Sequence, residues 1–270
     1  MGIGKVSSLA AASIGKVNSL AKASIDKIYS VAASFEAAGW SNTKSLAFDG
    51  SNDYVVVPFT AFDVGTISMW FKGTQINKKV YAKGGGASNF YFRNGSEQTR
   101  AMWVQNQANS AQIFDIATIS DPLDGNWHFL VVTTDGGSEQ VSTMKVYMDG
   151  NLEFTNGNEE TGRYTTDSSN MMIGATWDGY GTWNGNIDEV GIWEATALDA
   201  DAVTALYNSG EPIDLQTDVG DYGSSGDLTH YYRMGDGDTH PTITDAEGSI
   251  DGTMTNMASN DIVSDVPGSE

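Results

Sequence analysis

The sequence predicts a mainly β protein, in which two antiparallel sheets pack into a sandwich beside one short helix. From residue 44 onward, roughly ten short apolar segments follow one another at hairpin spacing. Gly, Asn and Asp clusters separate them, and the chain holds 31 Gly but only 5 Pro, which favours tight turns over long connections. Within this part of the chain, helical spacing of apolar residues is clearest at 199–210.

Composition limits the class of protein. A chain of 270 residues with 40% hydrophobic content can bury the core of one large β domain. The net charge is −21, and because residues 1–35 carry +3, the remainder carries −24. Such a body repels nucleic-acid phosphates and anionic membranes, so we expect no nucleic-acid partner and disfavour a membrane partner. Cysteine is absent, which excludes disulfides and thiolate sites.

Residues 1–39 form a separate N-terminal arm. An eleven-residue pattern recurs as GKVSSLAAASI, GKVNSLAKASI and DKIYSVAASF, and eleven residues span close to three helical turns. Lys and Ser interrupt each apolar run, so we expect neither a signal peptide nor a membrane span. A lone amphipathic helix is marginal in water. We therefore expect the arm to pack against copies of itself or a larger assembly; a helix lying on a membrane surface and an extended docking arm are the alternatives.

The apolar segments after the arm predict strands in order. Alternation is clearest at 67–71, and 127–134 is nearly continuous, as in a central strand. Asp149-Gly150 between two apolar segments predicts a tight hairpin, because both residues tolerate positive φ. The other expected strands are 46–48, 54–57, 80–82, 90–93, 100–105, 145–148, 152–154, 171–175 and 187–193.

The helix expected after the strand at 187–193 carries its own boundary signals. Asp199 is a suitable N-cap, because its carboxylate can accept from the free amides of the first turn. Val203, Leu206 and Tyr207 then give one apolar stripe, and Gly210 suits the left-handed position after a helix. This stretch predicts a small helix that covers the sandwich.

Six segments in one order resemble a known family. They are FDGSNDYVVVP, TISMWFK, DGNWHFLVVTTDGG, KVYMDGNL, MMIGA and GNIDEVGIWEATALDADAVTALYNSG, and the resemblance covers about residues 44–210. Together they resemble the laminin-G-like, concanavalin-A-like jelly roll. The resemblance implies a sandwich whose relatives often recognise carbohydrate, sometimes protein, and frequently hold structural calcium.

The resemblance also suggests a domain division. We assign 40–212 to the jelly roll and 213–227, rich in Gly, Asp and Ser, to a linker. Residues 228–270, with LTHYYRMGDGD and DGTMTNM, resemble the segment that usually opens such a domain, although here they follow the helix. They are expected to complete the same sandwich, as in a circular permutation; docking on a neighbouring copy is the alternative.

Three aspartates are candidate ligands for Ca²⁺. Asp49 and Asp53 share one loop. Asp188 lies at the start of a strand, and the alternation of side chains along a strand predicts that it shares a face with Val190 and Ile192. A carboxylate beside a core face is costly unless it is paired, hydrogen-bonded or bound to metal, and Ca²⁺ takes 6–8 oxygen ligands. The alternative is that these side chains cap turns.

One loop concentrates aromatic and polar residues suited to sugars. Trp177, Asp178, Tyr180 and Trp183 stand among glycines in 177–183. Exposed rings can stack on the C–H faces of sugars while carboxylates and amides bind hydroxyls. The competing interpretation is that one or two of these rings close the end of the sandwich.

The sequence gives little support for a catalytic function. The motifs G-x-S-x-G, H-E-x-x-H and the P-loop are absent, and the three histidines show no metal-ligand spacing. Retaining glycosidases need two carboxylates about 5 Å apart. Asp188 and Glu189 should face opposite sides of their strand, and Glu194 should lie roughly 20 Å from Asp188. We therefore expect no enzyme.

The repeats, the jelly roll and the ending TMTNM…DIVSDVP together resemble virion structural proteins of tailed marine phages. This predicts a homo-oligomeric decoration protein on the head or tail surface, outside the cell, whose arm binds virion proteins and whose sandwich binds glycan. A purely structural cement or fibre protein and a free lectin or adhesin are the alternatives.

Overall fold

The computed structural model describes residues 40–58, 65–75, 78–83, 88–94, 100–105, 111–115, 122–134, 144–155, 170–176 and 179–269. Residues 42–270 form one compact unit, separate from residues 1–41. The predicted arm, 1–39, lies outside the described residues. Among those residues, no helix has the length and apolarity needed to cross a membrane.

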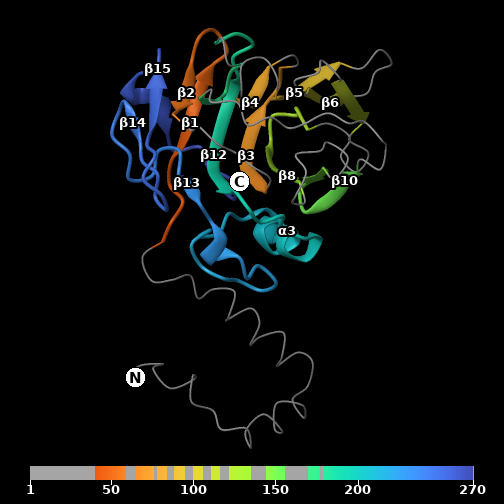
Figure 1. Cartoon of the computed structure of the whole chain (residues 1–270). Helices are drawn as coiled ribbons and strands as arrows, with labels where there is room; N and C mark the ends of the chain where they lie inside the picture. The colour runs from red at the N-terminus through yellow and green to blue at the C-terminus, as the bar shows by residue number, and fades with distance from the viewer. Residues whose placement is uncertain are drawn as a thin grey trace, which may run out of the picture. The chain divides into compact units, whose positions relative to one another are not determined.

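Two antiparallel sheets confirm the predicted fold class (Figure 1). Sheet A has the order β10 (Asn151–Thr155), β9 (Lys145–Met148), β8 (Trp127–Thr133), β3 (Thr66–Gly73), β12 (Asn184–Trp193), β1 (Ser45–Asp49) and β16 (Ile262–Val263), and β13 (His230–Tyr232) also pairs with β12. Sheet B has the order β14 (Thr242–Ile243), β15 (Gly252–Thr255), β2 (Tyr54–Val57), β11 (Met171–Ile173), β4 (Lys79–Lys83), β5 (Ser88–Asn94), β6 (Arg100–Gln105) and β7 (Ala111–Asp115).

The main core lies between the two sheets. Alternate residues of β3, namely Ile67, Met69 and Phe71, point inward and are buried, as their period of two predicts. From sheet B, buried side chains such as Val55 and Ile173 meet them. This inner face of sheet A carries the hydrophobic burial that stabilises the sandwich.

The outer face of sheet A is covered by helix α3 (Ala200–Tyr207) and the segments that follow it. Asp199 caps the helix as predicted, accepting from the Ala202 amide at 2.9 Å. The helix ends at Tyr207 because Asn208, rather than Gly210, takes the first left-handed conformation. Val203 and Leu206 are buried against an aromatic layer made of Trp70, Phe129, Tyr147, Trp193 and Tyr231.

The C-terminal segment contributes strands to both sheets. β13 pairs with β12 and β16 with β1 in sheet A, while β15 pairs with β2 in sheet B. In Figure 1 the late strand β15, drawn in blue, lies beside the early strand β2, drawn in orange. Strands from the two ends of the unit thus sit side by side.

Residues 213–227 have a linker's composition but are packed against the sandwich. Leu215 and Tyr222 are buried beside α3, and the Tyr222 hydroxyl donates to the Leu215 carbonyl at 2.7 Å. Two apolar anchors thus hold a segment whose remaining residues are mostly polar. The segment assigned to a linker from its composition is therefore held to the sandwich at these two residues.

Candidate functional site

The loop between β11 and β12 is closed by hydrogen bonds. The Thr176 amide donates to the Tyr180 carbonyl at 2.9 Å, and the Tyr180 amide donates to the Thr176 hydroxyl at 3.0 Å. Gly179 donates to the Thr176 carbonyl at 2.8 Å. This closed loop projects the Tyr180 side chain, which is 74% exposed. Two of the predicted glycan-binding residues, Trp177 and Asp178, lie outside the described residues.

The loop rests on strands of sheet B. A Cβ added at Gly179 would lie 3.6 Å from the ring of Tyr54 on β2. The Lys79 amide on β4 donates to the Gly181 carbonyl at 2.8 Å. Tyr180, the half-buried Tyr54 and the half-buried Lys79 therefore form one surface, which combines two rings with one cation.

Trp183 is placed in the core and not on this surface. Its ring is fully buried, packs edge-on against Phe71 at a centroid distance of 5.9 Å, and donates through Nε1 to the Asn186 carbonyl at 3.3 Å. A buried ring offers no face to a sugar, so the assignment of Trp183 to glycan contact is replaced by the alternative that it closes the sandwich.

Asp49 and Asp53 come together in the turn between β1 and β2, where they act as caps. Asp53 is buried and accepts from the Asp49 amide at 2.9 Å, while Asp49 accepts from Ser51 at 2.7 Å. Burial raises the pKa of Asp53, and the neighbouring carboxylates of Asp49 and Asp261 add to that effect. The hydrogen bond from the Ser51 amide lowers the pKa of Asp49. Both contacts organise the turn.

Asp188 does not join these two residues. Because Leu46 pairs with Ile187 and Asp49 with Asn184, Asp188 lies near Ser45, about 13 Å along the sheet from Asp49. Its carboxylate accepts from Asn42 Nδ2 at 2.8 Å and from the Glu189 amide at 2.9 Å. In the part of the chain that the structure describes, no three His, Cys, Asp or Glu side chains are grouped to hold a metal ion. The three aspartates therefore do not form one calcium site.

A β-bulge at Glu189 overturns the expected alternation in β12. Asp188 pairs with Trp70 and Gly191 with Ser68, so Glu189 and Val190 together oppose one residue, and Glu189 has φ +45°. Ile187 and Val190 therefore both face the inner core. Asp188 does not share their face, and Glu189 is bonded to Tyr231 of the outer layer, so the two carboxylates do not point to opposite sides.

Glu189 and Asp236 share a single guanidinium, that of Arg233. Glu189 accepts from the Tyr231 hydroxyl and from Arg233 Nη2 at 3.3 Å, and Arg233 also reaches Asp236 at 3.4 Å. Burial raises the pKa of Asp188 well above its usual value, and the charge of Glu189 adds to it. Burial likewise raises the pKa of Glu189 to about 7, against the opposing effect of Arg233. Asp236 in turn accepts from the amides of Thr43 and Lys44, so this cluster anchors the start of the sandwich.

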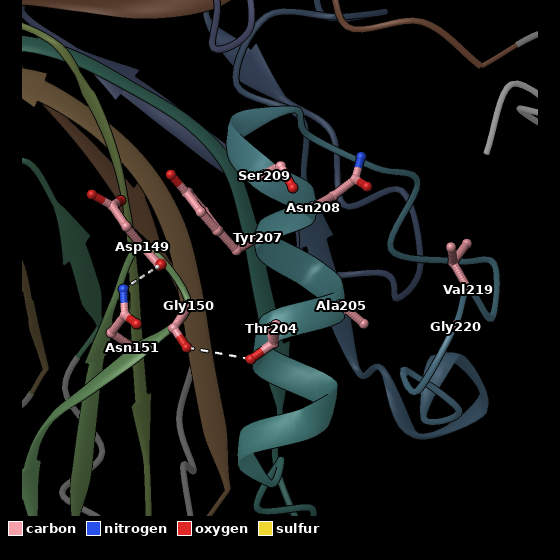
Figure 2. Close-up of a pocket in the computed structure, with 10 residues that line it drawn as sticks. All are labelled: Asp149, Gly150, Asn151, Thr204, Ala205, Tyr207, Asn208, Ser209, Val219 and Gly220. Carbon is pink, nitrogen blue, oxygen red and sulfur yellow. Dashed lines mark hydrogen bonds between the residues drawn. The ribbon is translucent and has the colours of Figure 1, made fainter. Parts of the chain in front are cut away.

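A second surface feature was not predicted from the sequence: a hollow of about 540 Å³ on the outer face of sheet A (Figure 2). Its walls are the β9–β10 turn, the exposed side of α3 and the loop at 219–220. These segments are far apart in the sequence and none carries a binding motif. Only the fold brings their polar groups together.

Residues 49–204 match the family described as the concanavalin A-like lectin/glucanases superfamily. The chain belongs to this superfamily. It is similar to the crystal structure of a protein from Bacteroides ovatus ATCC 8483 that is proposed to bind carbohydrate, with 19% identity and a TM-score of 0.59 over 84% of this chain. The match spans 62% of that protein, less than two thirds of its length.

A second similar structure is the heptameric SAP-like pentraxin from Limulus polyphemus, with 16% identity and a TM-score of 0.52. That match covers 78% of this chain and 95% of the pentraxin. At these identities both likenesses show the fold alone. Among curated proteins, no sequence matches.

Proposed function

We propose that this member of the superfamily is a non-catalytic carbohydrate-binding module, and that it contacts glycan through the surface formed by Tyr180, Tyr54 and Lys79. The observation that carries the proposal is the exposed Tyr180 ring, 74% accessible on a loop closed by four backbone and side-chain hydrogen bonds. A tyrosine held in this way offers a flat apolar face and a hydroxyl at low entropic cost.

The chemistry of this surface suits a hydroxylated ligand. The Tyr180 ring can stack on the C–H face of a sugar, and Lys79 on the neighbouring strand β4, whose side chain lies beside Gly181, adds a polar group next to it. With one stacking ring, each copy of the protein should bind glycan weakly. Many copies on one assembly would raise the avidity by 10²–10⁴ without any new contact.

The absence of catalysis is part of the proposal. Asp188 and Glu189 are 0% and 2% exposed, and their oxygens are engaged by Asn42, Tyr231 and Arg233. A glycosidase needs a carboxylic acid and a second carboxylate that both reach the cleaved bond. This acidic pair is occupied in holding the fold and does not reach solvent.

The finer role that we propose is that of a virion decoration protein, displayed outside the cell. Its support is the eleven-residue repeat of the arm, which suits attachment to other virion proteins or copies of itself, and the strongly acidic body. A cement or fibre protein that binds neighbouring subunits is the main alternative, and a free lectin or adhesin is the other.

A glycan array separates these roles. The full chain is expected to bind a defined set of glycans, and Tyr180→Ala is expected to reduce those signals at least tenfold while the melting temperature stays unchanged. Trp177→Ala tests the other predicted ring of the loop. A chain that binds no glycan, or whose binding is indifferent to both changes, would favour the cement role.

Calcium stays a prediction, now confined to the Asp49–Asp53 turn. Ca²⁺ bound there would stabilise the folded chain by mass action, so addition of the ion should raise the melting temperature and a chelator should reverse the rise. The control is Asp49→Asn, which should abolish the response. An identical melting temperature with Ca²⁺ and with chelator would remove calcium from the account.

A further inference from the structure

We propose that the hollow beside α3 is a second ligand site, which takes a neutral saccharide of two or three residues. It is distinct from the Tyr180 surface, because that loop rests on β2 and β4 of sheet B whereas the hollow lies on the outer face of sheet A. A volume of about 540 Å³ falls within the ~300–1,000 Å³ usual for small-molecule sites.

The walls of the hollow are held in place without a ligand. Asp149 and Gly150 form a two-residue hairpin turn, with φ of 49° and 76°. This turn lies against α3: the Thr204 hydroxyl faces the Gly150 carbonyl at 3.4 Å, and a Cβ on Gly150 would meet the Tyr207 ring at 3.2 Å. Figure 2 shows Thr204 and Tyr207 directed toward the turn, while Val219 and Gly220 stand on the other side of the helix.

The floor is rigid for a separate reason. The Tyr207 ring stacks on Trp70 and on Phe129, with centroid distances of 5.9 and 6.5 Å. On the far side, reciprocal backbone hydrogen bonds of 3.0 Å between Val219 and Tyr222 fix the loop. A pre-formed site loses little conformational freedom when a ligand binds, which favours affinity.

The polar groups that line the hollow are free to bind. Within the described part of the chain, the hydroxyls of Tyr207 and Ser209 make no hydrogen bond to protein, and the amides of Asn151 and Asn208 use only their nitrogens, at 3.0 and 3.2 Å. Two hydroxyls and two amide oxygens are thus available. Such a set matches the alternating donors and acceptors of sugar hydroxyls.

Charge decides which saccharides fit. None of the ten lining residues is Lys, Arg or His, and Asp149 is the one acidic member. Both Asp149 oxygens are engaged, by His128 Nδ1 at 2.7 Å and by the Phe129 amide at 2.8 Å, so its carboxylate is held at the wall. An anionic sugar would meet no Lys, Arg or His side chain among these lining residues that could pair with its charge. The Ala205 methyl and the exposed Val219 side chain give the hollow an apolar border.

The test uses the full ¹⁵N-labelled chain with three neutral probes (maltotriose, mannotriose and triacetylchitotriose) and 3′-sialyllactose as the acidic probe. At least one neutral probe should shift the amide signals of residues 149–151, 204–209 and 219–220, and should bind at least tenfold more tightly than 3′-sialyllactose. Thr204→Trp fills the hollow and should weaken this binding at least tenfold. Ala200→Trp, the same change one turn earlier on α3 and outside the hollow, should leave it unchanged.

Tyr180→Ala should also leave it unchanged, so the two sites can fail separately. If no neutral probe shifts these amides, or if 3′-sialyllactose binds as tightly, the hollow is not a saccharide site, whatever the Tyr180 surface does. Binding that Tyr180→Ala abolishes and Thr204→Trp does not would uphold the proposed function and overturn this inference. The wild-type shifts decide the matter even if Thr204→Trp fails to fold.

Discussion

The two faces of sheet A carry different kinds of side chain. The inner face is apolar from strand to strand, with Leu46, Met69 and Ile187 among its fully buried side chains. The outer face mixes a layer of aromatic rings with two buried carboxylates, Asp188 and Glu189, and is covered by α3 and by residues 211–228. Both faces exclude water, but the outer one does so while it buries these two carboxylates, which must be paired or hydrogen-bonded.

The inner face of the sheet therefore serves mainly stability, whereas the outer face also carries a proposed binding site. Burial of an apolar face stabilises the fold in proportion to the buried area, and this contribution does not depend on the direction of the contacts. A face with polar groups needs partners at defined distances, which come from elements distant in the chain, such as Arg233 and Asn42. The hollow lies on this outer face, where the covering elements leave polar groups at the surface.

The largest expected effect comes from removal of the elements that complete both faces. A chain that ends at Gly220 lacks β13, β14, β15 and β16, and with them buried side chains of both sheets. We expect it to lose its cooperative unfolding transition, as measured by circular dichroism during heating. A melting temperature equal to that of the full chain would show that the C-terminal segment is dispensable.

The inner face should respond next. Trp183→Ala removes a fully buried ring that packs on Phe71, and should cost about 3–5 kcal/mol of unfolding free energy. The control is Tyr180→Ala in the same loop, which should change stability by less than about 0.5 kcal/mol. Denaturant titration of both variants measures this. Equal losses for the two would contradict the assignment of one ring to the core and the other to the surface.

The outer face can be probed by a single methyl group. Gly191→Ala on β12 places a Cβ 2.6 Å from Leu215 and 2.8 Å from the Trp193 ring, so it should cost about 1–3 kcal/mol. Gly223→Ala is the matched control, because no atom lies within 4 Å of its added Cβ. If the two variants unfold at the same denaturant concentration, the covering segment does not pack on β12.

The smallest effect concerns pH. The pKa of Glu189 is raised from 4.5 to about 7, so between these values the folded chain holds a proton that the unfolded chain has released. The contribution of this retained proton to the free energy of unfolding is complete below pH 4.5 and is lost as the pH rises through 7. Asp188, Asp236, Arg233 and Tyr231 are the groups that face this carboxylate.

Glu189→Gln should therefore flatten the fall in unfolding free energy between pH 5 and pH 8 by on the order of 1 kcal/mol. The contrasting carboxylate is Asp245, where burial is outweighed by bonds from His230 and three backbone amides that lower the pKa to about 2. Asp245→Asn should lower stability mainly above pH 4, where the wild-type carboxylate is charged. Parallel pH profiles for wild type and Glu189→Gln would refute the assignment.

Sequence reasoning succeeded where a local rule governs the structure. Alternation placed Ile67, Met69 and Phe71 inside, Asp149-Gly150 made the hairpin turn, and Asp199 capped the helix. In each case the deciding contact lies within a few residues or follows from the period of a strand.

It failed where a distant partner governs the structure. The bulge at Glu189 places a non-glycine residue at positive φ, and its carboxylate is held by Tyr231 and Arg233, 42 and 44 residues away. The candidate metal set assumed that Asp188 follows simple alternation. The hollow joins three segments between residues 149 and 220, so no pattern in any one of them identifies it.

The most direct test of the proposed function is to map a bound glycan on the full chain by amide chemical shifts. With the strongest ligand from the array, we predict the largest shifts at Thr176 and at residues 179–181, with smaller shifts at Tyr54 and Lys79, and we predict their loss in Tyr180→Ala. Shifts confined to residues distant from this loop, or a map that Tyr180→Ala leaves intact, would contradict the assignment of glycan binding to the Tyr180 surface.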